Sequence, residues 1–228
     1  MKGSTGRTLR RLGSVTVLLG FVAGAAAQTI PASEAAATCF GESATIADHS
    51  GTIQGTPGDD VIIGNDGDND ITGKGGSDLI CGGDGDDIIV QDGNNSPLHA
   101  NGGKGNDTIE GGDLEDQLYG GAGNDELFGH FGYDELFGQG GDDVLWGGPT
   151  SDYLSGGEGK DQLSGLSGND ELHGGPGDDR LSGDEDTDDL YGEGGDDLLI
   201  GGADGASFFP GGGHDLCAEN TGGLVFPC

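Results

Sequence analysis

Large apolar residues recur at a nine-residue interval through most of this chain, and glycine-rich polar runs separate them. Each apolar residue lies between two variable residues. This pattern predicts a three-residue strand with one inward side chain, because side chains alternate between the two faces of a strand. The apolar positions are Ile62, Ile71, Ile80, Ile89, Leu98, Ile109, Leu118, Leu127, Leu136, Leu145, Leu154, Leu163, Leu172, Leu181, Leu190, Leu199, Phe208 and Cys217.

Eighteen nine-residue frames cover residues 55–218 and read Gly-Gly-x-Gly-x-Asp-x-U-x, where U is a large apolar residue. Residues 120–128 and 174–182 are clean examples. The fifth frame, residues 91–99, is degenerate, and Ala100 and Asn101 are two extra residues after it. Six glycine-rich residues before each strand predict a turn. The sequence therefore predicts an all-β fold, a flattened parallel β-roll solenoid with two frames per coil, about 40 Å long.

Four segments divide the predicted chain. Residues 1–37 resemble a secretion signal, with a basic start, a short apolar stretch and small residues that offer cleavage after Ala27 or Ala37. Residues 38–54 are predicted to cap the first coil, residues 55–218 to form the roll with an irregularity at 91–101, and residues 219–228 to cap the last coil. The predicted localisation is secreted, outside the cell.

Composition explains why such a chain needs help to fold. It has 53 glycines, 42 acidic residues and 8 basic residues among 228. Residues 38–228 carry 41 acidic and 4 basic residues, a net charge of −37. Little apolar surface is available for burial and the carboxylates repel one another, so the chain is either disordered or folded by bound cations. The charge also disfavours nucleic acid and anionic membrane surfaces.

Aspartate at the sixth frame position is the strongest chemical signal. Calcium takes six to eight oxygen ligands and accepts backbone carbonyls, whereas magnesium demands tight octahedral geometry. Glycine-rich turns expose carbonyls, and each aspartate adds a charged oxygen. We therefore predict multiple Ca²⁺ ions, with metal ligands Asp60, Asp78, Asp87, Asp107, Asp116, Asp125, Asp134, Asp143, Asp152, Asp161, Asp170, Asp179, Asp188, Asp197 and Asp215.

Some turns depart from this frame. The sixth position holds Asn69, Ser96 or Ala206 in three frames, and the last two should weaken or abolish their sites. The fourth position loses its glycine in five frames, which makes those turns weaker candidates: Asn94, Leu114, Thr150, Asp186 and Asp204.

Residues 55–90 and 102–218 resemble the hemolysin-type calcium-binding repeat, also called the repeats-in-toxin family. The resemblance implies a parallel β-roll with calcium in both rows of turns, and a chain that is unfolded inside the cell and folds after export. It also implies that the sixth-position aspartates and turn carbonyls ligate calcium. Enzymatic or toxic family members carry their activity in a separate domain.

The four cysteines leave the disulfide pairing open. Cys39, Cys81, Cys217 and Cys228 favour disulfides in an exported chain, and three pairings are possible, of which Cys39–Cys81 with Cys217–Cys228 would close the two ends.

Aromatic residues occupy position nine of four consecutive frames, where Tyr119 should pair with Phe137 and Phe128 with Trp146. Such pairs stabilise a sheet or bind a partner. A secreted adhesin or matrix protein, with an extracellular protein or glycan partner, is the main alternative. An ice- or carbohydrate-binding solenoid and a carrier module for an enzyme are weaker ones, and the scattered histidines do not indicate catalysis, so no enzyme is predicted.

Overall fold

The computed structural model describes residues 38–47, 51–92, 96–202, 204–219 and 225–228. The predicted signal sequence, residues 1–37, lies outside the described residues. The described residues form short strands joined by turns, and the predicted all-β parallel roll is confirmed. No helix in the described ranges has the length and apolar character of a membrane span.

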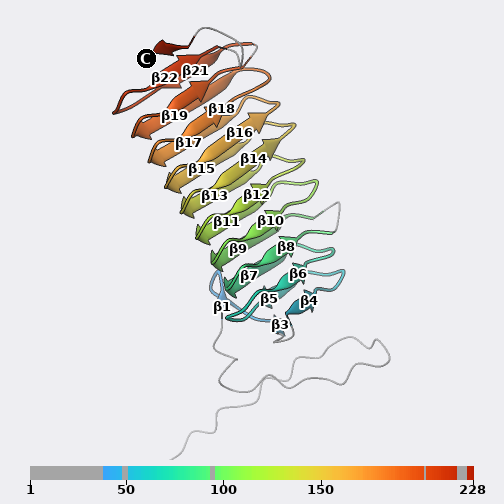
Figure 1. Ribbon diagram of the computed structural model, residues 1–228. Helices are drawn as coiled ribbons and strands as arrows, with labels where there is room; N and C mark the ends of the chain where they lie inside the picture. The colour runs from blue at the N-terminus through green and yellow to red at the C-terminus, as the bar shows by residue number, and fades with distance from the viewer. Residues whose placement is uncertain (1–37, 48–50, 93–95, 203, 220–224) are drawn as a thin grey trace, which may run out of the picture.

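Two mainly parallel sheets face each other, and the chain alternates between them from β3 to β22 (Figure 1). One sheet holds the odd-numbered strands β3 (Ile46–Ala47), β5 (Val61–Ile63), β7 (Asp78–Asp84), β9 (Leu98–Lys104), β11 (Gln117–Ala122), β13 (Glu135–Gly140), β15 (Tyr153–Glu158), β17 (Glu171–Pro176), β19 (Asp188–Gly194) and β21 (Ala206–Phe209). The other holds β4 (Thr52–Gln54), β6 (Asp70–Thr72), β8 (Ile88–Val90), β10 (Thr108–Glu110), β12 (Glu126–Phe128), β14 (Val144–Gly148), β16 (Gln162–Leu166), β18 (Arg180–Ser182), β20 (Leu198–Ile200), β22 (Leu216–Ala218) and β23 (Phe226–Pro227). We call them the odd sheet and the even sheet.

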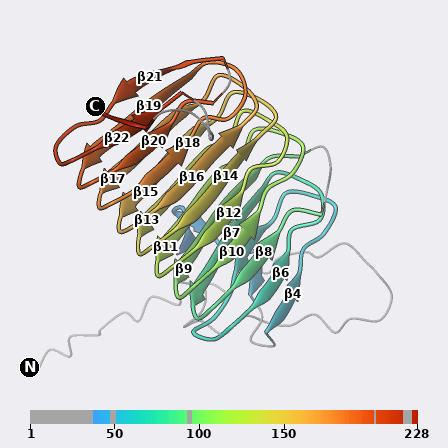
Figure 2. The ribbon, with the colours of Figure 1, turned by 45° about the horizontal axis from the view of Figure 1, so that its top comes forward.

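Coils stack in chain order from β3 and β4 at one end to β21 and β22 at the other (Figure 2). Each strand pairs in register with the strand one coil away, so that Leu118 lies beside Leu136 and Leu127 beside Leu145. Because the register repeats, one inward residue from every strand forms a column along each side of the interior. These two columns of Ile and Leu are fully buried and make up the core.

The frame at residues 91–101 differs from its prediction. Ala100 pairs with Ile80 and fills the inward eighth position, whereas Leu98 pairs with Asp78 and fills the sixth. The expectation that Ala100 and Asn101 are the extra residues is therefore wrong, because the turn before Leu98 takes up the added length. Strand alternation explains the choice, since it buries Leu98 and Ala100 together while His99 and Asn101 face outward.

Disulfides attach the chain segments at both ends to the roll. β1 (Thr38–Cys39) pairs with β2 (Glu42–Ser43) in a small antiparallel sheet, and Cys39 is bonded to Cys81 in β7, the third strand of the odd sheet. Cys217, at the inward position of β22, is bonded to Cys228. β23 lies antiparallel against β22 and covers that edge of the even sheet.

Candidate metal centre

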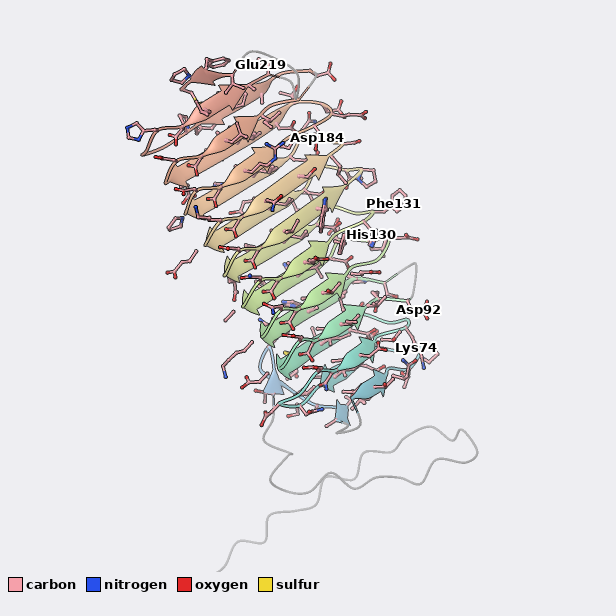
Figure 3. All side chains as sticks on the ribbon, in the orientation of Figure 1. Lys74, Asp92, His130, Phe131, Asp184 and Glu219 are labelled. Atoms are coloured by element: carbon pink, nitrogen blue, oxygen red, sulfur yellow. A yellow bond between two sulfur atoms is a disulfide. The ribbon has the colours of Figure 1, made fainter. Side chains whose placement is uncertain are left out.

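Turns of the roll form two rows. The odd row contains the turns that lead into odd-numbered strands, and the even row contains those that lead into even-numbered strands. Lys74, His130 and Asp184, all at position two of odd-row turns, lie along one edge of the roll (Figure 3). Sixth positions in the odd row are Asp60, Asp78, Leu98, Asp116, Asp134, Asp152, Asp170, Asp188 and Ala206. Sixth positions in the even row are Asn69, Asp87, Asp107, Asp125, Asp143, Asp161, Asp179, Asp197 and Asp215.

From Asp78 onward, one oxygen of each sixth-position carboxylate is held by the coil before it. Oδ1 of Asp143 accepts the backbone N–H of Asp125 at 2.8 Å, and Oδ1 of Asp134 accepts that of Asp116 at 2.8 Å. The same bond recurs along both rows, with N···O distances of 2.6–3.1 Å. The carboxylates are therefore stacked one coil apart and fixed in orientation.

The second oxygen of most of these aspartates is buried with no hydrogen-bond partner. A buried carboxylate oxygen left unpaired is destabilising, so a row of them fits a bound cation. The twelve aspartates with such an Oδ2 are Asp78, Asp87, Asp107, Asp125, Asp134, Asp143, Asp152, Asp161, Asp170, Asp179, Asp188 and Asp197.

Three of the fifteen predicted ligands differ from these twelve. Oδ2 of Asp60 accepts hydrogen bonds from the N–H and the hydroxyl of Thr56, at 2.6 and 2.9 Å. Oδ2 of Asp116 accepts the N–H of Gly112 at 2.6 Å. Asp215 lies in the last coil and is 8% exposed. The structure thus separates the predicted ligands into two classes that the frame alone does not distinguish.

Burial changes the proton affinity of these carboxyl groups. Desolvation, together with the neighbouring carboxylates of Asp125 and Asp161, raises the pKa of Asp143 to about 7 from 3.8, against a backbone hydrogen bond that lowers it. The pKa of Asp134 is raised furthest, to about 8, because burial and the charges of Asp116 and Asp152 both raise it. The charged form of these rows is therefore destabilised unless a cation neutralises it.

Glycines at the first position make room for the carboxylates. A Cβ on Gly120 would collide with Oδ2 of Asp125, and the same contact recurs in turn after turn. Carbonyl oxygens of earlier coils point at later glycines, so that a Cβ on Gly123, at φ 134°, would collide with the carbonyl of Gly105. Each turn therefore places carboxylate and carbonyl oxygens close together.

This donor set fits calcium. No three His, Cys, Asp or Glu side chains converge on one point among the described residues, so side chains alone do not form a site. Calcium accepts backbone carbonyls beside carboxylates, and the buried Oδ2 atoms supply the charged oxygens. When bound, calcium supplies the positive charge that offsets the repulsion within each row.

A second ladder of side chains at position five was not predicted. In the even row, Oδ1 of Asp86 accepts the N–H of Asn106 at 2.8 Å, and Oδ1 of Asn106 accepts that of Asn124 at 2.8 Å. These side chains support the following coil, whereas the sixth-position aspartates support the preceding one. The recurrence of Asp and Asn at position five is the sequence signal that could have revealed it.

The sequence of the repeats matches a known protein family. The family model of the RTX calcium-binding nonapeptide repeat matches residues 54–89, 101–136, 131–163, 155–190, 173–205 and 182–216. No curated protein is found to match the chain. With matching repeats over most of residues 54–216 and a parallel roll of stacked turns, the chain belongs to the RTX calcium-binding repeat family, whose repeats bind multiple calcium ions.

Proposed function

We propose that this chain is a secreted calcium-binding β-roll without catalytic activity, which folds as its turns take up calcium outside the cell. RTX repeats typically act outside cells, and the two disulfides fit an oxidising compartment. The observation that carries the proposal is the set of twelve buried Oδ2 atoms without a hydrogen-bond partner.

Within this proposal, the twelve aspartates with an unpartnered Oδ2 are the calcium ligands, together with turn carbonyls. Asp60 and Asp116 contribute little, because Thr56 and Gly112 already satisfy the oxygen that would face the metal. Affinity per site falls in the extracellular class, about 10⁻⁴–10⁻³ M. Calcium binding and folding are one event, since stacked turns from successive coils must be in place before the ligands meet.

Catalysis has no support from the described histidines. His173 hydrogen-bonds the carboxylates of Glu171 and Glu193 at 2.9 and 3.0 Å, and not a nucleophile. His99 stacks on Phe40 with ring centroids 3.7 Å apart. We therefore assign the repeats a structural role.

The test is a far-UV circular dichroism titration of residues 38–228, which contain every described strand, with calcium and with magnesium as the control. A sharp coil-to-β transition near millimolar calcium, absent with magnesium, supports the proposal. A β signal that is already complete in chelator at about pH 8, where the carboxylates are charged, contradicts it, because the turns would then be stable without their cations.

A second candidate function is adhesion to an extracellular partner through the outward aromatic residues. The observation that favours it is the stacking of Tyr119 on Phe137, at 4.9 Å, and of Phe128 on Trp146, at 4.4 Å. Loss of surface binding in the double variant Phe137→Ala and Trp146→Ala, with an unchanged calcium response, would support adhesion. Unchanged surface binding in that variant would contradict it.

A further inference from the structure

Aromatic rings form a continuous ladder across the outer face of the odd sheet. Successive ring centroids lie 3.7–5.7 Å apart. We call this set the aromatic ladder, and its members are Phe40, His99, Tyr119, Phe137, Tyr153, His173, Tyr191 and Phe209. The even sheet carries the pair Phe128 and Trp146, with His130 beside Phe128.

Ring faces in the ladder are largely covered by neighbouring rings. Tyr191 stacks on His173 at an interplanar angle of 4° and on Phe209 at 8°, with centroids 4.4 Å apart in both pairs. Such rings present their edges to the outside, which gives a narrow apolar strip. A sugar that stacks on an open ring face is therefore a poorer occupant than an apolar side chain that packs along the strip.

Carboxylates flank the strip. Glu135, Glu171 and Asp189 occupy position seven of β13, β17 and β19 in register, and Glu193 reaches His173. Burial raises the pKa of Tyr153, and Glu171, Glu193 and Glu135 raise it further, as expected in a negative field. These position-seven carboxylates lie on strands and not in turns, so calcium bound by the turns would leave them charged.

Basic side chains of the described chain lie elsewhere. Lys74, Lys104 and Lys160 are in or beside the turns, where Lys104 pairs with Asp84 at 2.8 Å. Arg180 belongs to β18 in the even sheet. Of the flanking carboxylates, Glu171 and Glu193 hydrogen-bond His173 in the ladder itself, so the acidic charge left for a cationic partner is mainly that of Glu135 and Asp189.

A cavity of about 340 Å³ adjoins the N-terminal end of the ladder. Its wall includes Glu115, Tyr133 and Glu135 beside His99, and it also borders the odd row of turns at Asp78 and Asp116. Burial lowers the pKa of His99, which keeps the ring neutral at neutral pH. Carboxylates and an aromatic wall in a small cavity suit an ammonium or guanidinium group on an apolar stem.

We propose that the aromatic ladder and this cavity bind an extended polypeptide segment rich in Lys or Arg and in apolar residues. A second copy of the chain is disfavoured because residues 38–228 carry a net charge of −37. The ladder crosses β9 to β21, seven neighbouring strands of the odd sheet. At about 4.8 Å per strand this is about 30 Å, the length of about ten extended residues. Apolar side chains pack along the strip, and a basic side chain enters the cavity.

This inference rests on the calcium-loaded roll of the proposed function. The experiment measures fluorescence anisotropy of a labelled Lys/Phe peptide of about ten residues against the folded chain in millimolar calcium. Matched peptides replace every Lys by Glu or every Phe by Ser. We expect binding of the Lys/Phe peptide alone, weakened by added salt because the carboxylates are exposed.

Variants locate the binding face. Glu135→Gln with Phe137→Ser, on the odd sheet, should weaken binding by about tenfold or more. The control, Glu126→Gln with Phe128→Ser, changes the corresponding positions of β12 in the even sheet and should leave the affinity within about twofold. Calcium titration of each variant by circular dichroism verifies that the roll still forms. Glu135→Gln alone tests the charge without removing a ring.

Equal loss in the two double variants, equal binding of the Glu peptide, or no binding of the Lys/Phe peptide to the folded chain would overturn the inference. Preferential binding of a neutral glucan oligosaccharide or of anionic vesicles would overturn it as well. Failure of the proposed function looks different, because the chain would then be folded in chelator, and peptide binding to that folded chain is still measured.

Discussion

The two rows of turns follow the same frame with different fidelity. Every turn of the even row has glycine at position four, and its aspartates run unbroken from Asp87 to Asp215. The odd row loses that glycine at all five positions where the sequence departs from the frame, and Leu98 and Ala206 interrupt its aspartates. The repeat therefore has one regular row and one that tolerates side chains.

Backbone geometry explains part of the difference. From Gly85 onward, position four of the even row takes positive φ, as at Gly123 with 134°, a conformation that side chains strain. In the odd row, Asp186 also takes positive φ, at 71°, whereas Leu114 and Thr150 do not, so the turns at Leu114 and Thr150 follow another path. The altered turn at Leu114 is the one in which Gly112 satisfies Asp116. The irregular turn at Leu114 thus provides a partner for its own carboxylate, whereas Asp152 and Asp188, which follow the irregular turns at Thr150 and Asp186, keep an unpartnered Oδ2.

The largest expected effect is that of pH on the calcium-free roll. Because burial raises the pKa values to about 6–8 from 3.8, as in Asp87 and Asp134, the folded state holds more protons than the unfolded chain. Stability from this source is present below about pH 4 and is lost as pH rises through about 6–8. In chelator, circular dichroism should show β-structure at about pH 5 and coil at about pH 8.

Calcium should remove that dependence. Calcium binds the charged carboxylates, and the unfolded chain is also charged at about pH 6–8, so folding to the calcium-loaded roll exchanges few protons in this range. Stability in saturating calcium, measured by urea unfolding, should therefore change little between about pH 6 and about pH 8, although Asp134 and Asp143 have pKa values of about 8 and about 7 in the calcium-free roll. A stability in calcium that falls from about pH 6 to about pH 8, as expected in chelator, would be inconsistent with buried carboxylates as the ligands.

The next effect concerns the glycine of the even row. Gly123→Ala combines positive φ with a collision against the carbonyl of Gly105, and should lower the free energy of unfolding by at least about 2 kcal/mol. Gly140→Ala is the control, since its Cβ would have only the carbonyl of Gly121 at 3.9 Å and its φ is not positive. It should change stability by less than about 0.5 kcal/mol in urea unfolding with calcium.

A smaller effect separates the two classes of aspartate. Asp143→Asn keeps an acceptor for the N–H of Asp125 but removes the charge of an unpartnered oxygen. At calcium ten times the site Kd, losing that site should lower the free energy of unfolding by about 1.4 kcal/mol. Asp116→Asn should leave the calcium stoichiometry unchanged in isothermal titration, because Gly112 already satisfies that carboxylate. Equal losses in the two variants would remove the distinction between the classes.

The smallest net effect is expected from restoring an aspartate at an interrupted sixth position of the odd row. Leu98→Asp places a carboxylate between Asp78 and Asp116, whose Oδ1 already accepts the N–H of residue 98 at 2.6 Å. Lost apolar burial of about 2 kcal/mol should be offset by a new calcium site, for a net change below about 1 kcal/mol in millimolar calcium. Calcium stoichiometry should rise by one ion, and an unchanged stoichiometry would show that the turn before residue 98 cannot be repaired by charge alone.

Most of the fold could be predicted because the frame keeps its phase. From Gly102 to Pro210 the nine-residue interval does not slip, so the inward residue of each strand could be named. The pairing of Tyr119 with Phe137 and of Phe128 with Trp146 followed from the same phase and is confirmed. The two-residue insertion near Ala100 could not be placed from the sequence, since two apolar residues lie two positions apart and either one could face inward. Pairing with the neighbouring strand selects which of them does so.

By itself, the sequence determined the parallel roll, the inward apolar columns, the acidic sixth positions and the need for a cation, because each depends on a local repeat and on charge. Only the tertiary structure decided which oxygens remain unpartnered, which cysteines pair and which aromatic residues join one ladder. Those outcomes depend on contacts between coils 18 or 20 residues apart, such as Asp125 N–H to Asp143 and Asp87 N–H to Asp107. A nine-residue frame specifies the strand and turn but not the neighbour against which they stack.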